Sequence, residues 1–336
     1  MRAVGITGAG GYIGQRLIAY LEKQDWCTRI LATDIRAPTL ESSKLTFSKK
    51  DIREPSLIDF WRDQDVTTVV HLAFVVDPMH DEKLMYDINV NGTLNVLKLC
   101  EELEVGHVIV ASSGTAYGAW LDNPEVLKED DPIRVFPPKF SYAHHKGLIE
   151  GHCAEFIERH PEVIFNIVRP CVVYGPNTDN YLSRLFGRMS FISLVDGRDP
   201  HMQFVHEDDV AQLFSLLIEK KIPGPFNVAG DGPMRFSEIG AMIGKKSKRV
   251  PRWLAYGMAW LMWRLRMPMV EGPEGIIDYT AYPWVLDTTR AKELLGWKPR
   301  YDTRETVRIM LETHGFQLVE QEVLSSRRVK KPPSRA

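Results

Sequence analysis

The sequence has few cysteines and no excess of charge of either sign. Its four cysteines, Cys27, Cys100, Cys153 and Cys171, lie far apart, without the spacing of a Cys-x-x-Cys pair or a disulfide framework. We therefore expect reduced thiols and a cytoplasmic protein. Lys and Arg number 42 against 44 Asp and Glu, a net charge of −2. This balance provides no basic field for nucleic acid and favours a small-molecule substrate.

The sequence also lacks an apolar run of the roughly 20 residues that a membrane-spanning helix needs. Its most apolar stretch, Trp253 to Met267, is shorter, and Arg264 and Arg266 interrupt its end. We expect a buried or lid helix there, with weak peripheral membrane contact as the alternative. The N-terminal residues run directly into an expected strand and glycine loop, so we expect neither a signal peptide nor integral membrane insertion.

Short apolar segments alternate with helical periodicity in the first half of the chain, which is typical of parallel βαβ units. The pattern predicts an α/β fold, a Rossmann-type doubly wound parallel sheet with a smaller C-terminal substrate lobe. The expected strands are Ala3–Thr7, Arg29–Asp34, Leu45–Ser48, Thr68–Leu72, His107–Ser112 and Ile164–Arg169. The expected helices are Tyr12–Lys23, Pro55–Asp63, Met85–Leu103 and Tyr142–Arg159.

The same pattern predicts how the chain is divided. Residues 1–175 are expected to form the Rossmann domain, and a segment at about 203–230 is expected to return to it. The substrate lobe is expected from residues 176–202 and 231–315. The last residues, 316–336, are basic and contain proline, and we expect a flexible tail.

A glycine-rich turn follows the first expected strand and opens the first expected helix. Gly8, Gly11 and Gly14 are spaced three apart in TGAGGYIG at 7–14, with Tyr12 and Ile13 before the last glycine. Small residues let the backbone approach a pyrophosphate at a helix N-terminus, where free N–H groups favour negative charge. The turn therefore predicts a phosphate-binding loop, with a simple tight strand-to-helix turn as the alternative.

Asp34 ends the second expected strand, twenty residues after Gly14, with Ile35 beside it. A carboxylate at this position can accept hydrogen bonds from an adenosine ribose and repels a 2′-phosphate. We therefore expect NAD rather than NADP. NADP is the alternative cofactor because of Arg36, since an arginine near that position can bind the 2′-phosphate.

The sequence resembles the NAD-dependent epimerase/dehydratase family, the extended short-chain dehydrogenases/reductases, over roughly residues 2 to 315. The segments that carry the resemblance are TGAGGYIG at 7–14, Asp51-Ile52, HLAF at 71–74, NVNGTLNV at 89–96, SSGTAYG at 112–118, Tyr142–Lys146, RPCVVYGP at 169–176, FVHEDDVA at 204–211 and LGWKPRY at 295–301.

The resemblance implies a catalytic Ser113, Tyr142 and Lys146. Tyr142 and Lys146 are four residues apart on an expected helix and so share a face, where an ammonium can stabilise a phenolate. Free tyrosine, with a pKa of about 10, needs such help to act as an acid/base near neutrality. By resemblance the lysine also binds the nicotinamide ribose, and Ser113 hydrogen-bonds the reacting oxygen. Thr115 could assist.

The resemblance implies further cofactor contacts. Asp51 and Ile52 are expected to contact the adenine. Leu72, Ala73 and Phe74 are expected beside the pyrophosphate, and Pro170, Val172 and Val173 beside the nicotinamide. Asn91 is expected to tie two loops of the sheet together.

Histidines offer no comparable pattern. His144 and His145 have no acidic or cysteine partners at metal-ligand spacing, so we predict no metal and expect cofactor-facing or solvated helix positions. His201 is given the same interpretation. His206 belongs to an expected structural junction in which Asp209 caps a helix.

The reaction remains open between several classes. Dehydratases of the family have an acid/base pair where Gly114-Thr115 stands, and sugar-nucleotide enzymes usually have phosphate-binding residues where Val172 and Met202 stand. Arg184, Arg188 and Arg198 could still bind phosphate. We favour reversible hydride transfer between NAD and a secondary alcohol or ketone, for which the Trp- and Met-rich stretch would suit a hydrophobic substrate. An NDP-sugar 4-epimerase acting through a 4-keto intermediate, and a non-catalytic NAD sensor or scaffold, are the alternatives.

By resemblance we expect a homodimer paired through Met85–Leu103 and Tyr142–Arg159.

Overall fold

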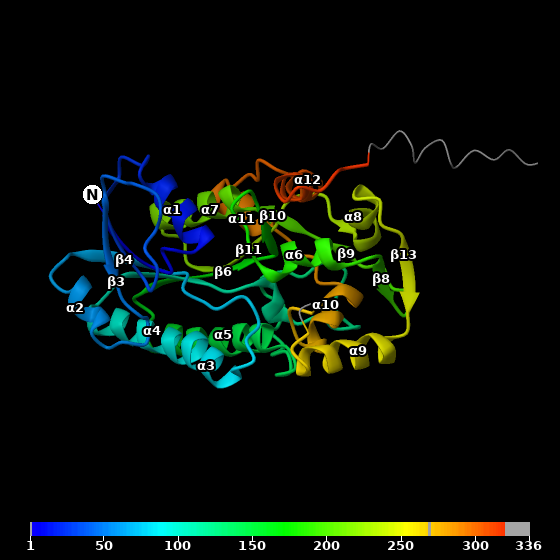
Figure 1. Ribbon diagram of the computed structural model, residues 1–336. Coiled ribbons are helices and arrows are strands. Elements are labelled where there is room, and N and C mark those ends of the chain that lie inside the picture. Colours follow the sequence, from blue (N-terminus) through cyan, green and yellow to red (C-terminus); the bar gives the residue numbers. More distant parts are fainter. Residues whose placement is uncertain (1, 268–269, 320–336) are drawn as a thin grey trace, which may run out of the picture.

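A parallel sheet of seven strands forms the centre of the computed structural model, which describes residues 2–267 and 270–319 (Figure 1). The strand order is β11-β6-β5-β4-β1-β2-β3. The expected α/β fold with a doubly wound sheet is thereby confirmed. The strands are β1 (Arg2–Thr7), β2 (Cys27–Asp34), β3 (Leu45–Lys49), β4 (Val66–His71), β5 (His107–Ala111), β6 (Ile164–Pro170) and β11 (Gly224–Val228).

The central strands contain runs of consecutive buried apolar residues because both faces of the sheet are covered. Side chains alternate between the faces: Ile30 packs into one buried cluster and Leu31 into the other. Ile109 and Val110 divide in the same way. This burial on two faces explains why the strands appear in the sequence as short continuous apolar runs.

Helices form a layer on each face of the sheet (Figure 1). One layer contains α1 (Tyr12–Leu21), α7 (Glu207–Lys220), α11 (Thr289–Leu295) and α12 (Thr303–Thr313). The other contains α2 (Leu57–Trp61), α3 (Glu82–Tyr86), α4 (Gly92–Glu102) and α5 (Ser141–Arg159). The helix expected over Met85–Leu103 is interrupted by a π-helical turn, η1 (Asp87–Asn91).

The remaining elements lie mostly beyond the carboxyl ends of the strands, on the right of Figure 1. β11, from the segment expected to return to the sheet, pairs with β6. The other strands pair as β7 (Val172–Tyr174) with β10 (Phe204–His206), β8 (Ile192–Val195) with β13 (Ser247–Val250), and β9 (His201–Met202) with β12 (Met234–Arg235). The helices are η2 (Gly114–Tyr117), α6 (Tyr181–Arg188), α8 (Phe236–Met242), α9 (Arg252–Arg264), η3 (Glu274–Ile277) and α10 (Asp278–Ala281).

Two details of the expected local structure are wrong. Of the buried or lid helix expected at Trp253 to Met267, the buried alternative is excluded, because no residue of α9 is buried and Trp253 is 76% exposed. Asp209 does not cap α7; His206 does, accepting a hydrogen bond from the Asp208 N–H. Asp209 is instead buried, accepts from the N–H groups of Arg300 and Tyr301, and so anchors a distant loop. Of the expected tail, residues 320–336 lie outside the described residues.

The chain reverses direction across the sheet between β1 and β4. From β1 it proceeds through β2 to β3 on one side, and then returns to build β4, β5, β6 and β11 on the other. In open parallel sheets, ligands bind in the crevice at such a switch point, beyond the carboxyl ends of the strands. The loops after β1 and β4 therefore mark the candidate site.

Candidate active site

The three glycines spaced along the loop after β1 have different structural roles. A Cβ on Gly8, whose φ is +76°, would lie 2.5 Å from the backbone nitrogen of Ala73, and one on Gly14 would lie 2.3 Å from the carbonyl oxygen of Gly8. These two glycines permit close packing of loop, helix and neighbouring strand. A Cβ on Gly11 would meet only the Gly8 oxygen, at 3.3 Å. The loop is therefore open at the N-terminus of α1, as a pyrophosphate requires.

Asp34 lies across this loop with its carboxylate fixed by backbone groups. Oδ2 accepts a hydrogen bond from the Gly10 N–H and Oδ1 one from the Arg36 N–H, both at 3.0 Å. Arg36 is exposed beside it. The carboxylate is thus held next to the glycine loop, where it suits a ribose diol.

Most of the predicted cofactor contacts line one cleft, whose volume is about 810 Å³. The predicted residues in its lining are Gly8, Gly11, Tyr12, Asp34, Ile35, Asp51, Ile52, Leu72, Ala73 and Phe74. The predicted cofactor residues that do not line the cleft are Ile13, Gly14, Asn91, Tyr142, Lys146, Pro170, Val172 and Val173. The cofactor role of every predicted position except Asn91 stays a prediction. The shape of the loop and cleft fits a dinucleotide.

A buried chain of hydrogen bonds fixes the cleft residues that follow β4. Thr7 Oγ1 lies 2.7 Å from His71 Nδ1, and His71 Nε2 lies 3.0 Å from Thr93 Oγ1. Thr93 donates to the Asn89 carbonyl, so His71 donates through Nε2 and accepts through Nδ1. Burial lowers the pKa of His71 to about 3. This histidine is therefore neutral and structural, and it positions Leu72 to Phe74.

The structure brings Ser113, Tyr142 and Lys146 together beyond β5. Ser113, at the N-cap of η2, lies within hydrogen-bonding reach of Tyr142, which is in the first turn of α5. Lys146 lies one turn later with Nζ 5.8 Å from the centre of the Tyr142 ring. Its ammonium donates to the carbonyl oxygen of Ala111, at 2.7 Å. Tyr142 and Lys146 share a helix face, as their spacing predicts.

Burial is the largest influence on the pKa values of Tyr142 and Lys146. It raises the pKa of the Tyr142 hydroxyl, which the hydrogen bond with Ser113 lowers in part. It lowers the pKa of Lys146 to about 7, against the opposing effect of Glu150. The tyrosine is therefore protonated at neutral pH, and the lysine is poised to change charge there.

Phe74 connects these residues to the cleft. Its ring lines the cleft, packs edge-on against Tyr142 with centroids 5.5 Å apart, and lies 3.4 Å from Lys146 Nζ. A cation over an aromatic face is favourable, more so when desolvated. Thr115 is also close, because its N–H donates to Ser113 Oγ at 3.1 Å, and its own buried hydroxyl makes no hydrogen bond to the described chain.

The prediction for Asn91 is wrong, and the neighbouring Asn89 has the role assigned to it. Asn91 is exposed and bonds to the Asp87 side chain. Asn89 is fully buried, accepts from the Val75 N–H at 2.7 Å and donates to its carbonyl at 3.2 Å. Both asparagines lie in the π-helical turn, whose wider spacing shifts which side chains face inward. The sequence shows two asparagines close together, and without knowledge of the π-helical turn it does not reveal which one is buried.

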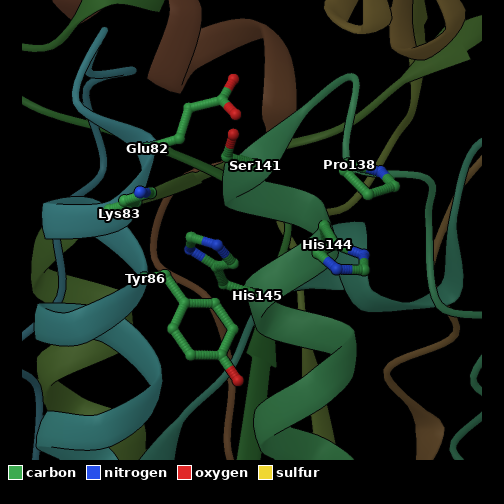
Figure 2. Close-up of a pocket in the computed structure, with 7 residues that line it drawn as sticks. All are labelled: Glu82, Lys83, Tyr86, Pro138, Ser141, His144 and His145. Carbon is green, nitrogen blue, oxygen red and sulfur yellow. The ribbon is translucent and has the colours of Figure 1, made fainter.

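His144 and His145 line a separate, shallow pocket of about 320 Å³ between α3 and the start of α5 (Figure 2). His144 Nδ1 lies 2.7 Å from the Phe136 oxygen, and His145 packs edge-on against Tyr86. Neither histidine lines the cofactor cleft; His145 is buried and so is not a solvated position, and His144 is half-buried. Within residues 2–267 and 270–319, no group of three or more His, Cys, Asp and Glu could hold a metal ion.

The lobe arginines considered for phosphate binding are engaged otherwise. Arg184 pairs with Asp77 at 2.7 Å, Asp179 at 2.6 Å and Glu271 at 2.8 Å. Arg188 pairs with Glu271 at 2.6 Å. Arg198 is exposed and lies over the Tyr282 ring. The charge of Arg184, which lines the cleft, is balanced by carboxylates.

Comparisons with known proteins agree with this fold. An uncharacterized protein of Mycobacterium tuberculosis is 28% identical over 315 residues, 90% of this chain and 82% of its own. The fold matches MoeE5 in complex with UDP-glucuronic acid and NAD, with a TM-score of 0.71 and 24% identity over 93% of this chain and 98% of that one. It also matches the Thermus thermophilus UDP-glucose 4-epimerase complex with NAD, with a TM-score of 0.70 and 21% identity over 93% and 99%.

The family comparison confirms the resemblance found in the motifs. The model of the NAD dependent epimerase/dehydratase family matches residues 4–229, which include the glycine loop, Asp34 and the Ser113, Tyr142 and Lys146 positions. This chain therefore belongs to the NAD dependent epimerase/dehydratase family and is an NAD-dependent enzyme of the extended short-chain dehydrogenase/reductase type.

Proposed function

We propose that the protein interconverts a secondary alcohol and its ketone, with Tyr142 as the acid/base, Ser113 as the second partner of the reacting oxygen and Lys146 as the cation beside them. The observation that carries the proposal is that Ser113 and Lys146 both lie beside Tyr142, with Lys146 Nζ 5.8 Å from the centre of its ring. NAD, when bound, accepts the hydride from the carbinol carbon or returns it. Gly11, Asp34 and the cleft residues after β4 would hold it.

The Tyr142 and Ser113 hydroxyls have different roles at the substrate oxygen. During oxidation the substrate O–H proton passes to the Tyr142 oxygen, the C–H pair leaves as hydride, and the carbon–oxygen double bond forms. Ser113 Oγ donates to the developing carbonyl oxygen. A protonated Lys146 lowers the cost of the tyrosinate that must exist before the proton is taken. Because burial alone raises the pKa of Tyr142, this electrostatic help is needed for turnover near neutrality.

The lobe favours a substrate without a nucleotide diphosphate. Binding a diphosphate commonly uses an arginine with free donors. Arg184 is surrounded by Asp77, Asp179 and Glu271, and Met202 is buried in the pair of β9 with β12. None of Trp253, Tyr256, Trp260 and Trp263 lines the cleft.

The experiment is to incubate the purified protein with NAD and a panel of secondary alcohols, and to follow NADH by its absorbance. We expect stoichiometric NADH from at least one alcohol and its loss in Tyr142→Phe. Tyr86→Phe, which changes an exposed tyrosine on α3, is the matched control and should retain full turnover. Turnover of alcohols by Tyr142→Phe at the wild-type rate would contradict the proposal.

A sugar-nucleotide 4-epimerase is the second candidate, favoured by the fold shared with the Thermus thermophilus enzyme. Epimerisation would use the same Ser113, Tyr142 and Lys146, with the ketone reduced again on its other face. It predicts NAD that stays bound through purification, and interconversion of UDP-sugars without net NADH. Release of free NADH from an alcohol, with no change in UDP-sugars, would exclude it.

A further inference from the structure

Helix α9 is apolar on both its inner and its outer face. Its inner residues contact the protein: Tyr256 accepts from Lys139 at 3.0 Å, and Trp263 stacks on His80 with centroids 3.9 Å apart. A surface helix normally presents polar residues on its other face. Here that face carries large apolar side chains that are 38% to 76% exposed, namely Trp253, Leu254, Met258, Trp260 and Leu261, and the following turn adds Leu265 and Met267.

These exposed side chains form a continuous strip. Trp253, Leu261 and Leu265 are 76%, 49% and 62% exposed and are spaced at multiples of four residues, so they lie along one side of the helix. Met258 and Trp260 flank them. Contiguous apolar surface of this kind on a folded protein marks a contact with a membrane or another macromolecule.

Along the chain, the residues on either side of the strip carry charge of one sign. Between Glu238 and Glu271 the chain contains no acidic residue. It contains seven basic residues there: Lys245, Lys246, Lys248, Arg249, Arg252, Arg264 and Arg266. Five of these, all but Lys245 and Arg252, are exposed, and Arg264 lies over the Trp260 ring with its guanidinium carbon 5.7 Å from the ring centre. The strip is thus bordered by positive charge at both ends.

We propose that α9 docks the protein on an anionic phospholipid surface, lying in the interface with Trp253, Leu261 and Leu265 among the lipids and its arginines at the headgroups. Exposed tryptophan, leucine and methionine with arginine at the edge are typical of interfacial helices. Its 13 residues span roughly 20 Å, less than the bilayer core of about 30 Å. No helix in residues 2–267 and 270–319 is long and apolar enough to cross a membrane.

A second copy of the chain is a less suitable occupant. In a two-fold symmetric contact centred on α9, the exposed Arg264 and Arg266 of one copy would approach the basic ends of the other. Like charges across an interface oppose association. An anionic lipid surface instead neutralises all of them.

The test is sedimentation of the full chain with vesicles of phosphatidylcholine alone and of phosphatidylcholine with phosphatidylglycerol. We expect binding to the anionic vesicles that is at least ten-fold tighter than to the neutral ones, and weaker at high salt. Trp253→Ser with Leu261→Ser should weaken it at least ten-fold, as should Arg264→Glu with Arg266→Glu. Leu294→Ser, an equally exposed leucine on the distant α11, should bind as wild type (Figure 1).

Several results would overturn the proposal. One is an unchanged affinity in the Trp253/Leu261 variant while its thermal midpoint equals that of wild type. Another is loss of binding only when the basic residues Arg327, Arg328, Lys330 and Lys331 are replaced by Gln in the full chain. A fall in molecular mass of the Trp253/Leu261 variant in sedimentation equilibrium would assign the strip to self-association instead. Quenching of tryptophan fluorescence by brominated lipid in wild type, reduced in that variant, would support docking.

Discussion

Arg169 and Glu150 form a buried ion pair behind the catalytic residues. Arg169 Nε donates to Glu150 Oε1 at 2.9 Å and Nη2 donates to Oε2 at 2.8 Å, and both side chains are less than a tenth exposed. Ser112 donates to the same carboxylate, at 2.6 Å, and Arg169 also donates to the Tyr117 hydroxyl, at 2.7 Å. The pair thus joins β6, α5 and η2, and it fixes the helix that carries Tyr142.

Arg169→Leu should destabilise the protein by about 3–5 kcal/mol, because it leaves the Glu150 carboxylate buried without its cation. Urea unfolding measures the loss. Arg308→Leu is the matched control, since Arg308 pairs with Glu312 at 3.0 Å on an exposed helix surface. It should cost less than about 1 kcal/mol. Similar losses in the two variants would show that Glu150 is not effectively buried.

Ser113→Ala should lower kcat by about 10²–10³, because the reacting oxygen loses one donor while Tyr142 remains. The dissociation constant for NAD should stay near that of wild type, since Ser113 does not line the cofactor cleft. Steady-state kinetics and calorimetric titration with NAD separate the two effects. An equal rise in the NAD dissociation constant would place Ser113 in cofactor binding instead. Ser141→Ala, one helix position before Tyr142, serves as a control and should retain kcat.

Elements governed by local patterns could be predicted from the sequence. The six strands expected from short apolar runs are all present, because a parallel sheet covered on both faces requires such runs. The glycine loop could be predicted from its spacing, and the positions of Ser113, Tyr142 and Lys146 from the family motifs. Tyr142 and Lys146 share a face because a helix repeats every 3.6 residues.

Features that depend on tertiary context could not be predicted. Glu150 and Arg169 appear in the sequence as an ordinary helix acid and strand base, and nothing local pairs them. The π-helical turn moves the inward position from Asn91 to Asn89. The sequence does not predict which face of α9 points outward, because the helix is apolar all round and periodicity does not distinguish its two sides.

Asp34→Ser should weaken NAD binding by about 10–100-fold, since a hydrogen bond to a charged group contributes about 1.5–3 kcal/mol. NADP should lose less or gain, because the variant removes the charge that repels a 2′-phosphate while Arg36 remains beside the cleft. Calorimetric titration with both dinucleotides gives the ratio. Asp59→Ser, an exposed carboxylate on α2, should leave both affinities unchanged. An unchanged NAD to NADP ratio in Asp34→Ser would mean that Asp34 does not contact the ribose.

Gly11→Ala and Gly14→Ala should fail in different ways. A Cβ on Gly11 meets only the Gly8 oxygen at 3.3 Å, so the variant should fold but bind NAD more weakly. A Cβ on Gly14 would lie 2.3 Å from that oxygen and 2.9 Å from the Ala9 Cα, which forces the loop from the helix. We expect that variant to lose about 1–3 kcal/mol of stability. Thermal unfolding and NAD titration of both proteins distinguish the roles, and a stable, NAD-binding Gly14→Ala would contradict the packing argument.

Lys146→Met should show a stability difference from wild type that depends on pH. Burial lowers the pKa of Lys146 to about 7 in the folded protein, whereas an unfolded lysine titrates near 10.4. Between these values the unfolded chain binds the proton that the folded chain lacks, so wild-type stability rises with pH in this window. Below about pH 7 the folded protein carries the full cost of a buried ammonium, and there Lys146→Met should gain most relative to wild type.

Urea unfolding at about pH 6 and about pH 10 measures the change. The gain should shrink toward the higher pH, while Lys83→Met, on the exposed surface of α3, should stay within about 0.5 kcal/mol of wild type. A gain for Lys146→Met that is the same at both pH values would show that the ammonium is solvated in the folded state, and the electrostatic role given to Lys146 would then need water to transmit it.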